Sequence, residues 1–179
     1  PDDPKVKRRL GYLPEETLLY DYLTAEETLD FFASLFKIPK AERKKRVQQL
    51  IEMLGLQKVA KRKVGEFSKG MARRIALAQA LINDPDLIIL DEPTSGLDPV
   101  GCREVKDLIK TLAARGKTIF LTSHLLSDVE DLVDRVCVLY GGEVRVQGHL
   151  DELLTIDEQS RIVAPKISVD QCDRILQIL

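Results

Sequence analysis

Hydrophobic positions in the first half of the chain recur at helical spacing. Residues 24–36 place leucine, phenylalanine and alanine three and four positions apart, and Thr24 with Glu27 forms the reciprocal N-cap pair called a capping box. A second amphipathic stretch covers residues 40–54 and ends before a glycine. We therefore predict that residues 17–83 are mostly helical.

The pattern changes in the middle of the chain. Residues 87–90 form a short apolar run between acids, which is typical of a strand buried on both faces of a parallel sheet. A helix is predicted next, capped by Asp98 and ended by Gly116, and a β-branched strand over residues 118–122 follows it. Strand, helix and strand in this order indicate an α/β fold.

The last third of the chain predicts a hairpin and a tail. Residues 135–140 and 143–147 flank a pair of glycines, which favours two antiparallel strands. Upstream of them, Ser127 and Glu130 predict a second capping box at the start of a short helix. From residue 149 onward the chain is expected to be helical and peripheral.

Composition indicates a globular chain of roughly one domain. Of 179 residues, 44% are hydrophobic and 31% are charged, which argues against a disordered chain. No apolar run approaches the ~18 to 20 residues that a bilayer span needs, and no signal-like segment opens the chain, so a soluble protein is expected. Cys102, Cys137 and Cys172 lie far apart without close histidines, which predicts neither disulfides nor a zinc site and favours a reducing cytoplasm.

A basic segment is hidden by the net charge of −2. Residues 37–74 hold thirteen lysines and arginines and only three acids. This segment could bind nucleic acid or a membrane surface, or it could be the solvated face of helices beside a nucleotide site. Residues 38–66 contain no aromatics on which bases could stack. We therefore predict no nucleic-acid partner.

Two adjacent carboxylates, Asp91 and Glu92, follow the predicted buried strand. Ligands bind at the carboxyl ends of strands in open α/β sheets, and adjacent residues on a strand point to opposite sides. One acid could organise hydrated Mg²⁺ while the other orients and deprotonates a water. The pair could also be an exposed start of a turn before Pro93, and the two residues alone do not decide between these interpretations.

Three further residues lie where a phosphate could bind. Ser68 can cap the helix that begins with Lys69 and Gly70, and the first N–H groups of that helix could meet an anion. A plain helix cap is the alternative explanation, and Lys69 could face either a γ-phosphate or solvent. His124 directly follows a predicted strand and is either a surface residue or part of a ligand site.

The order of these motifs resembles the ATP-binding cassette family, the nucleotide-binding domains of ABC transporters, over nearly all of residues 8–154. Residues 67–71 match the signature loop, residues 87–91 match the Walker B strand, and residues 95–98 match the D-loop. The signature loop keeps the serine and the second glycine of the family pattern and departs from it at the other three positions.

The resemblance implies a catalytic or metal-binding role for four residues. Asp91 would organise Mg²⁺, and Glu92 would act as the catalytic carboxylate on the attacking water. His124 would be the switch histidine, which contacts the γ-phosphate and that water. Glu15 lies where the family usually has the Q-loop glutamine and keeps an oxygen for Mg²⁺ or water, although it lacks the donor of an amide.

The same resemblance implies ATP contacts. Ser68 and Gly70 would bind the ATP held by a second cassette, Asp98 of the D-loop would complete the site across the interface, and Glu15 would lie beside the nucleotide. The cofactors implied are ATP and Mg²⁺.

A phosphate-binding P-loop is expected outside this sequence. The single Gly-Lys-Thr, residues 116–118, lies between a predicted helix and a predicted strand, which is the wrong order for a P-loop. The family loop would then lie upstream of Pro1, and this chain alone is expected to be inactive as an ATPase.

The implied fold is α/β, a partial P-loop NTPase-type ABC ATPase core with an inserted helical subdomain. It divides the chain into a Q-loop region and strand remnant over residues 1–16, a helical subdomain with the signature loop over residues 17–85, an ATPase core over residues 86–148, and a C-terminal helical appendage over residues 149–179.

The implied function is that of the ATP-binding and ATP-hydrolysing subunit of an ABC transporter. The motifs are most similar to those of cassettes serving drug, antibiotic or polysaccharide exporters. Its partners would be a second nucleotide-binding domain, in a homodimer or heterodimer, and a transmembrane permease that holds it in the cytoplasm at the inner face of the membrane. The alternatives are a soluble ABC-type ATPase without a permease and a degenerate, non-hydrolysing interaction module.

Overall fold

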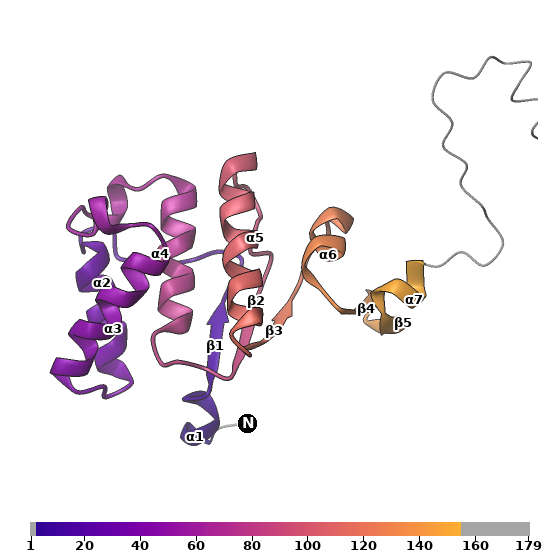
Figure 1. The fold of residues 1–179 in the computed structure, drawn as a ribbon, viewed down its shortest axis with the longest axis horizontal. Helices are drawn as coiled ribbons and strands as arrows, with labels where there is room; N and C mark the ends of the chain where they lie inside the picture. The colour runs from indigo at the N-terminus through magenta and orange to yellow at the C-terminus, as the bar shows by residue number, and fades with distance from the viewer. Residues whose placement is uncertain (1–2, 155–179) are drawn as a thin grey trace, which may run out of the picture. The chain divides into compact units, whose positions relative to one another are not determined.

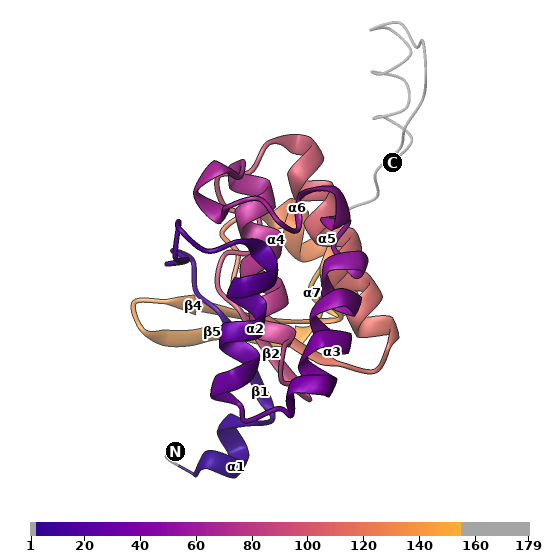
Figure 2. The ribbon, with the colours of Figure 1, turned by 90° about the vertical axis from the view of Figure 1, so that its left-hand side faces the viewer.

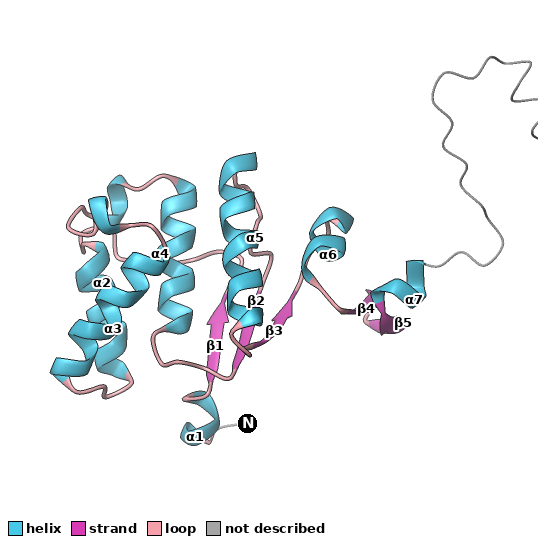
Figure 3. Cartoon of the chain, viewed as in Figure 1, coloured by secondary structure: helices cyan, strands magenta, loops and turns pink. Residues whose placement is uncertain are grey.

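The computed structural model describes residues 3–154, and the chain separates into two compact units, residues 1–133 and 134–179. Figure 1 and Figure 3 show the helices and strands of both units. The predicted four-part division of the chain stays a prediction. Most of its last part, together with Cys172, lies outside the described residues.

A helical layer forms the first half of unit one (Figure 1, Figure 2). Its elements are α2 (Ala25–Leu35), α3 (Lys40–Met53), η1 (Gln57–Val59), η2 (Val64–Glu66) and α4 (Lys69–Leu81), whereas α1 (Pro4–Lys7) lies apart from it at the start of strand β1 (Leu10–Leu13) (Figure 1). The predicted capping box is confirmed, because Glu27 N–H donates to Thr24 Oγ1 at 3.2 Å and Thr24 N–H donates to Glu27 Oε2 at 2.8 Å. Helices α2, α3 and α4 contact one another and bury their apolar faces together.

Three parallel strands form the sheet of unit one: β1 (Leu10–Leu13), β2 (Leu87–Leu90) and β3 (Thr118–Leu121), in the order β1-β2-β3. Strand β2 pairs with β1 on one side and with β3 on the other. Because both pairings are parallel, all three strands end at the same edge of the sheet. The α/β fold expected from the strand–helix–strand order is confirmed. Because the strands share this direction, the segments that follow them lie at the same edge of the sheet.

Only one face of this sheet is covered within the described residues. Ile88 and Leu90 are fully buried and join the core with residues of α4 and α5 (Pro99–Ala114). On the other face, Tyr12 and Phe120 flank the half-buried Ile89 and remain 51% and 58% exposed. The prediction of burial on both faces is therefore confirmed for the inner face alone, since an apolar run does not reveal which faces are packed.

Strand β1 and helix α4 approach closely enough to require a glycine. A Cβ atom built on Gly11 would lie 2.2 Å from the carbonyl oxygen of Ala80. Any side chain at Gly11 would therefore push the sheet away from α4. The helical layer and the sheet are packed as one unit through this contact.

The start of α5 differs in one respect from the sequence prediction. Asp98 occupies the N-cap position and Pro99 the first turn, but the Asp98 side chain accepts no hydrogen bond from the helix. The predicted apolar face is confirmed by the burial of Val105, Leu108, Ile109 and Leu112. Gly116 ends the segment with a φ of +83°.

The second predicted capping box is wrong. Helix α6 spans Leu126–Leu132 and its N-cap is Leu125, so Ser127 lies inside the first turn, where its hydroxyl cannot cap the helix. Ser123 supports this start instead, because its Oγ accepts from Leu125 N–H at 3.1 Å. A local Ser-x-x-Glu spacing does not decide where a helix begins.

Unit two contains the predicted hairpin. Strands β4 (Arg135–Tyr140) and β5 (Glu143–His149) pair antiparallel, and Gly141 and Gly142 make the turn with φ values of +60° and +81°. Helix α7 (Leu150–Leu154) follows β5 at the end of the described residues.

Candidate active site

The acidic residues of the candidate site lie where the parallel strands end. Asp91 and Glu92 follow β2, Glu15 lies two residues after β1, and His124 lies three residues after β3. Thr122, the residue directly after β3, lies beside the acids. The shared direction of the three strands therefore places these side chains at one edge of the sheet.

Thr122 fixes the two acids, although the residue pattern predicts it only as part of a strand. Its Oγ1 donates to Asp91 Oδ1 at 2.7 Å and accepts from Glu92 N–H at 3.0 Å. One hydroxyl thus orients the Asp91 carboxylate and the Glu92 backbone. Asp91 Oδ2 has no hydrogen-bond partner in the described part of the chain, so it remains available to a ligand.

Glu92 and His124 form an ion pair at this edge. The distance between Glu92 Oε2 and His124 Nδ1 is 2.9 Å, and the Glu92 side chain is 17% exposed whereas that of His124 is 67% exposed. The hydrogen bond to Glu92 and the Glu92 charge raise the pKa of His124 above its ordinary value, with smaller contributions from Glu15 and Asp128. Glu15, although exposed, is therefore close enough to act on His124 electrostatically.

Glu92 also has an unusual backbone conformation. Its φ is +45°, in the left-handed region that non-glycine residues rarely adopt. Its carbonyl accepts from Ser95 N–H at 3.1 Å, which closes the turn that leaves the strand. Strained backbone of this kind gathers at functional sites and persists only where surrounding contacts hold it.

Arg73 of α4 makes more hydrogen bonds than any other side chain near the acids, and no sequence motif predicted it. It is 7% exposed. Its acceptors are the carbonyl oxygens of Pro14, Glu15, Asp91, Glu92 and Pro93 and the hydroxyl of Thr17, at 2.7 to 3.1 Å. Burial lowers the pKa of Arg73, while the charges of Asp91 and Glu15 oppose that effect. The sequence signal was an arginine at a core-facing position of an apolar helix.

The D-loop is anchored behind the acids. Buried Thr94 donates its hydroxyl to the Asp128 carboxylate, which pairs with Lys106 Nζ at 2.8 Å. Lys106 pairs equally closely with Asp131, and these hydrogen bonds raise the pKa of Lys106. Asp98 is exposed at the far end of the same loop.

The signature loop makes few internal contacts. Ser68 Oγ accepts from Met71 N–H at 3.3 Å, so Ser68 caps α4 as predicted. Within residues 3–154, no hydrogen bond engages the N–H groups of Lys69 and Gly70, and none joins Ser68 or Gly70 to Asp91, Glu92 or His124. The space above Gly70 is open.

Lys69 extends over the D-loop. A Cβ atom on Gly96, whose φ is +65°, would lie 1.9 Å from Lys69 Nζ. This position therefore requires a glycine both for its conformation and for the lysine beside it. Lys69 is exposed, and whether it contacts a phosphate stays a prediction.

The acids fit a magnesium ion that takes most of its ligands from elsewhere. Within the described residues, no three His, Cys, Asp or Glu side chains are grouped to hold a metal alone. Mg²⁺ usually takes one or two protein carboxylates and completes its shell with phosphate oxygens and water. The Oδ2 of Asp91, which has no hydrogen-bond partner within the described residues, matches such a donor set.

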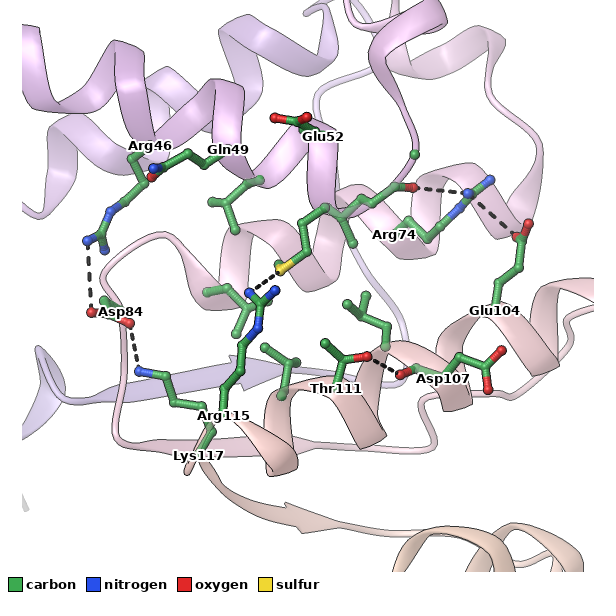
Figure 4. A pocket seen from close by; sticks show the side chains of 17 residues that line it. Arg46, Gln49, Glu52, Arg74, Asp84, Glu104, Asp107, Thr111, Arg115 and Lys117 are labelled. Atoms are coloured by element: carbon green, nitrogen blue, oxygen red, sulfur yellow. Dashed lines mark hydrogen bonds and ion pairs between the residues drawn. The ribbon is translucent and has the colours of Figure 1, made fainter.

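A separate hollow of about 920 Å³ lies between α3, α4 and α5 (Figure 4). Its charged lining residues largely pair with each other: Lys117 Nζ lies 2.6 Å from Asp84, and Arg74 lies 3.5 Å from Glu104. Arg74 also donates to the carbonyl of Leu54 at 3.1 Å. This hollow does not include the acids after β2.

Known proteins match this chain in sequence and in structure. The family model described as ABC transporter matches residues 1–95. An ABC transporter ATP-binding protein of Synechocystis is 49% identical over 90% of this chain and 46% of its own length, and the bacitracin transport ATP-binding protein of Bacillus licheniformis is 42% identical over 83% of this chain and 48% of its own. A dimeric ATP-binding cassette solved in a post-hydrolysis state with ADP and Pi has a TM-score of 0.71 and 29% identity, over 83% of this chain and 68% of that one.

The fold is that of the ATPase cassettes of ABC transporters, as the resemblance predicted. The chain belongs to the ABC transporter family, and its relatives are ATP-binding proteins of that family. It spans about half the length of these two curated relatives. None of the helices within residues 3–154 is both long enough and apolar enough to cross a membrane.

Proposed function

We propose that this chain is part of the ATP-binding and ATP-hydrolysing subunit of an ABC transporter. The observation that carries the proposal is the Glu92–His124 pair, held beside Asp91 at the carboxyl end of β2. A carboxylate next to a histidine at this edge can accept a proton from a water and keep a fixed orientation while it does so.

In the proposed reaction, Glu92 takes a proton from the attacking water as the water oxygen bonds to the γ-phosphorus and the bond to ADP breaks. His124 donates to Glu92 through Nδ1, and we assign its second nitrogen to the γ-phosphate, since the His124 side chain is 67% exposed. Thr122 holds Asp91 and the Glu92 backbone in place throughout. Mg²⁺, when bound by Asp91 and Glu15, would neutralise charge on the phosphate oxygens.

In the proposed function, the signature loop binds the ATP that is held by a second cassette. Ser68 and Gly70 offer helix N–H groups that no group of the described chain occupies, and such groups favour phosphate. We assign them to the ATP of a partner cassette, with Asp98 at the interface. The similar cassette solved as a dimer supports pairing with a second cassette, in a homodimer or a heterodimer.

The transport partner is proposed from the relatives. Their names describe ATP-binding proteins of transporters, one of them for bacitracin transport. We propose a permease partner that places the subunit at the inner face of the cell membrane, and an antibiotic or drug-like cargo. ATP hydrolysis would then drive the movement of that cargo.

The test replaces Glu92 in the full-length subunit, at the length of its relatives. Glu92→Gln should lower ATP turnover by ~10² to 10⁴, the typical contribution of a general base, while ATP binding is retained. Glu16→Gln is the matched control, because Glu16 is an exposed acid one residue from Glu15. Near-normal turnover by Glu92→Gln would contradict the proposal.

A further inference from the structure

We infer that Arg73 is a positioning residue, whose guanidinium holds the backbones of Glu92 and Glu15 in fixed places relative to the signature helix α4. The inference rests on the proposed function, because it assigns Glu92 to the hydrolysis of ATP. Arg73 itself touches neither carboxylate through a salt bridge within the described residues. It acts through the main chain.

The chemistry of the guanidinium explains why the contact is specific. Arginine has five N–H donors in a rigid plane. Here Nε and both terminal nitrogens are engaged, and the six acceptors are neutral oxygens rather than carboxylates. A buried charge is costly unless it is well hydrogen-bonded. The carbonyl dipoles at the ends of two strands supply that compensation.

The acceptors belong to two chain segments that are far apart in sequence. One terminal nitrogen of Arg73 donates to the carbonyls of Pro14 and Glu15, at 2.7 and 2.9 Å, in the segment that follows β1. The other donates to the carbonyls of Asp91 and Glu92, at 2.8 and 2.9 Å, in the segment that follows β2. A displacement of α4 is therefore transmitted to both segments at once.

The strained backbone of Glu92 gives this contact a catalytic consequence. The carbonyls on both sides of the Glu92 N–Cα–C unit accept from the same nitrogen of Arg73, and Thr122 accepts from the Glu92 N–H. These bonds surround a residue whose φ is +45°. They hold the conformation in which the Glu92 carboxylate lies 2.9 Å from His124.

Lysine at position 73 would keep the positive charge but could not make most of the hydrogen bonds of the guanidinium. An ammonium offers three donors from a single point, so it cannot span both segments as the fork does. Arg73→Lys is therefore a graded variant, and Arg73→Met removes every donor. Arg74→Met is the matched control, because Arg74 is the next residue of α4 and contacts Leu54 and Glu104 instead (Figure 4).

Hydrogen exchange in the full-length subunit tests the positioning role directly. Three amides report on this segment. Asp91 N–H donates to the carbonyl of Leu13, Glu92 N–H to the hydroxyl of Thr122, and Ser95 N–H to the carbonyl of Glu92. In Arg73→Met they should exchange at least ~10-fold faster than in the wild type, with a smaller increase in Arg73→Lys, while α5 amides keep their rates. Arg74→Met should leave the three amides unchanged.

Kinetics of ATP hydrolysis provide the second readout. Arg73→Met should lower kcat by ~10²-fold, because a small misplacement of a catalytic group has that effect, with KM for ATP nearly unchanged and partial recovery in Arg73→Lys. Two results would overturn the inference. One is that, in both Arg73 variants, the exchange rates of the three amides rise over wild type by no more than those of the α5 amides. The other is that the substitutions change only the KM for ATP. If the wild type hydrolyses no ATP, the proposed function fails, and the exchange measurement still decides whether Arg73 positions the segment.

Discussion

The two halves of the candidate site differ in how fully the chain itself satisfies their polar groups. In the acidic half, Asp91, Glu92 and His124 are joined by hydrogen bonds to one another or through Thr122. In the signature half, Ser68 Oγ accepts from Met71 N–H, and the N–H groups of Lys69 and Gly70 make no hydrogen bond within the described residues. The acidic half is therefore preorganised, and we expect the signature half to bind a ligand.

Removing the Thr122 hydroxyl from the acidic half should have a larger effect than removing the Ser68 hydroxyl from the signature half. In Thr122→Val, Asp91 loses its donor and the Glu92 N–H loses its acceptor. ATP turnover of the full-length subunit should fall by ~10 to 10²-fold, because both acids shift from their places. Thr118→Val is the control, because Thr118 lies at the start of the preceding strand β3, where its side chain is exposed and makes no hydrogen bond to the acids. Equal turnover in the two variants would show that the hydroxyl of Thr122 is dispensable.

A smaller effect is expected in the signature half. Ser68→Ala removes the cap of α4, and loss of such a cap typically costs ~1 kcal/mol of unfolding free energy. Denaturant titration should detect this loss, and ATP-driven dimer formation should weaken beyond it. Ser127→Ala, inside the first turn of α6, should change neither quantity. A dimer that forms normally in Ser68→Ala would remove Ser68 from the ATP site.

The smallest change is a shift in the titration of His124. Because Glu92 raises the pKa of His124, Glu92→Gln should lower that pKa toward its ordinary value, which NMR can follow with His149 as a reference. Because the pKa of His124 is raised in the folded state, the pair also makes the stability of the fold depend on pH. The pair stabilises the folded state below the ordinary histidine pKa, and this contribution disappears as the pH rises through the raised pKa. An unchanged pKa for His124 would mean that the pair does not form in solution.

Local patterns predicted the elements well because the relevant contacts are near in sequence. The capping box at Thr24 and the apolar face of α5 follow from spacings of three and four residues. The same local rule failed at Ser127, where the strand end before α6 determines the helix start. Whether both faces of β2 are covered also depends on what packs there, which the apolar run cannot reveal.

The candidate site could be predicted only in outline. Asp91, Glu92 and His124 stand out because polar residues follow apolar strands. Arg73 does not, since its acceptors lie 18 to 59 residues away and all but the Thr17 hydroxyl are backbone carbonyls, which leave no trace in the residue types. The role of Thr122 similarly depends on the pairing of β2 with β3.

A mixing experiment tests most directly whether the acidic half of one copy acts with the signature half of another. Full-length Glu92→Gln keeps an intact signature loop, and Ser68→Arg keeps intact acids. Each variant alone should turn over ATP very slowly, whereas an equimolar mixture should recover a substantial part of wild-type turnover, because mixed dimers contain one site with both halves intact. A mixture no more active than its two components would contradict the account.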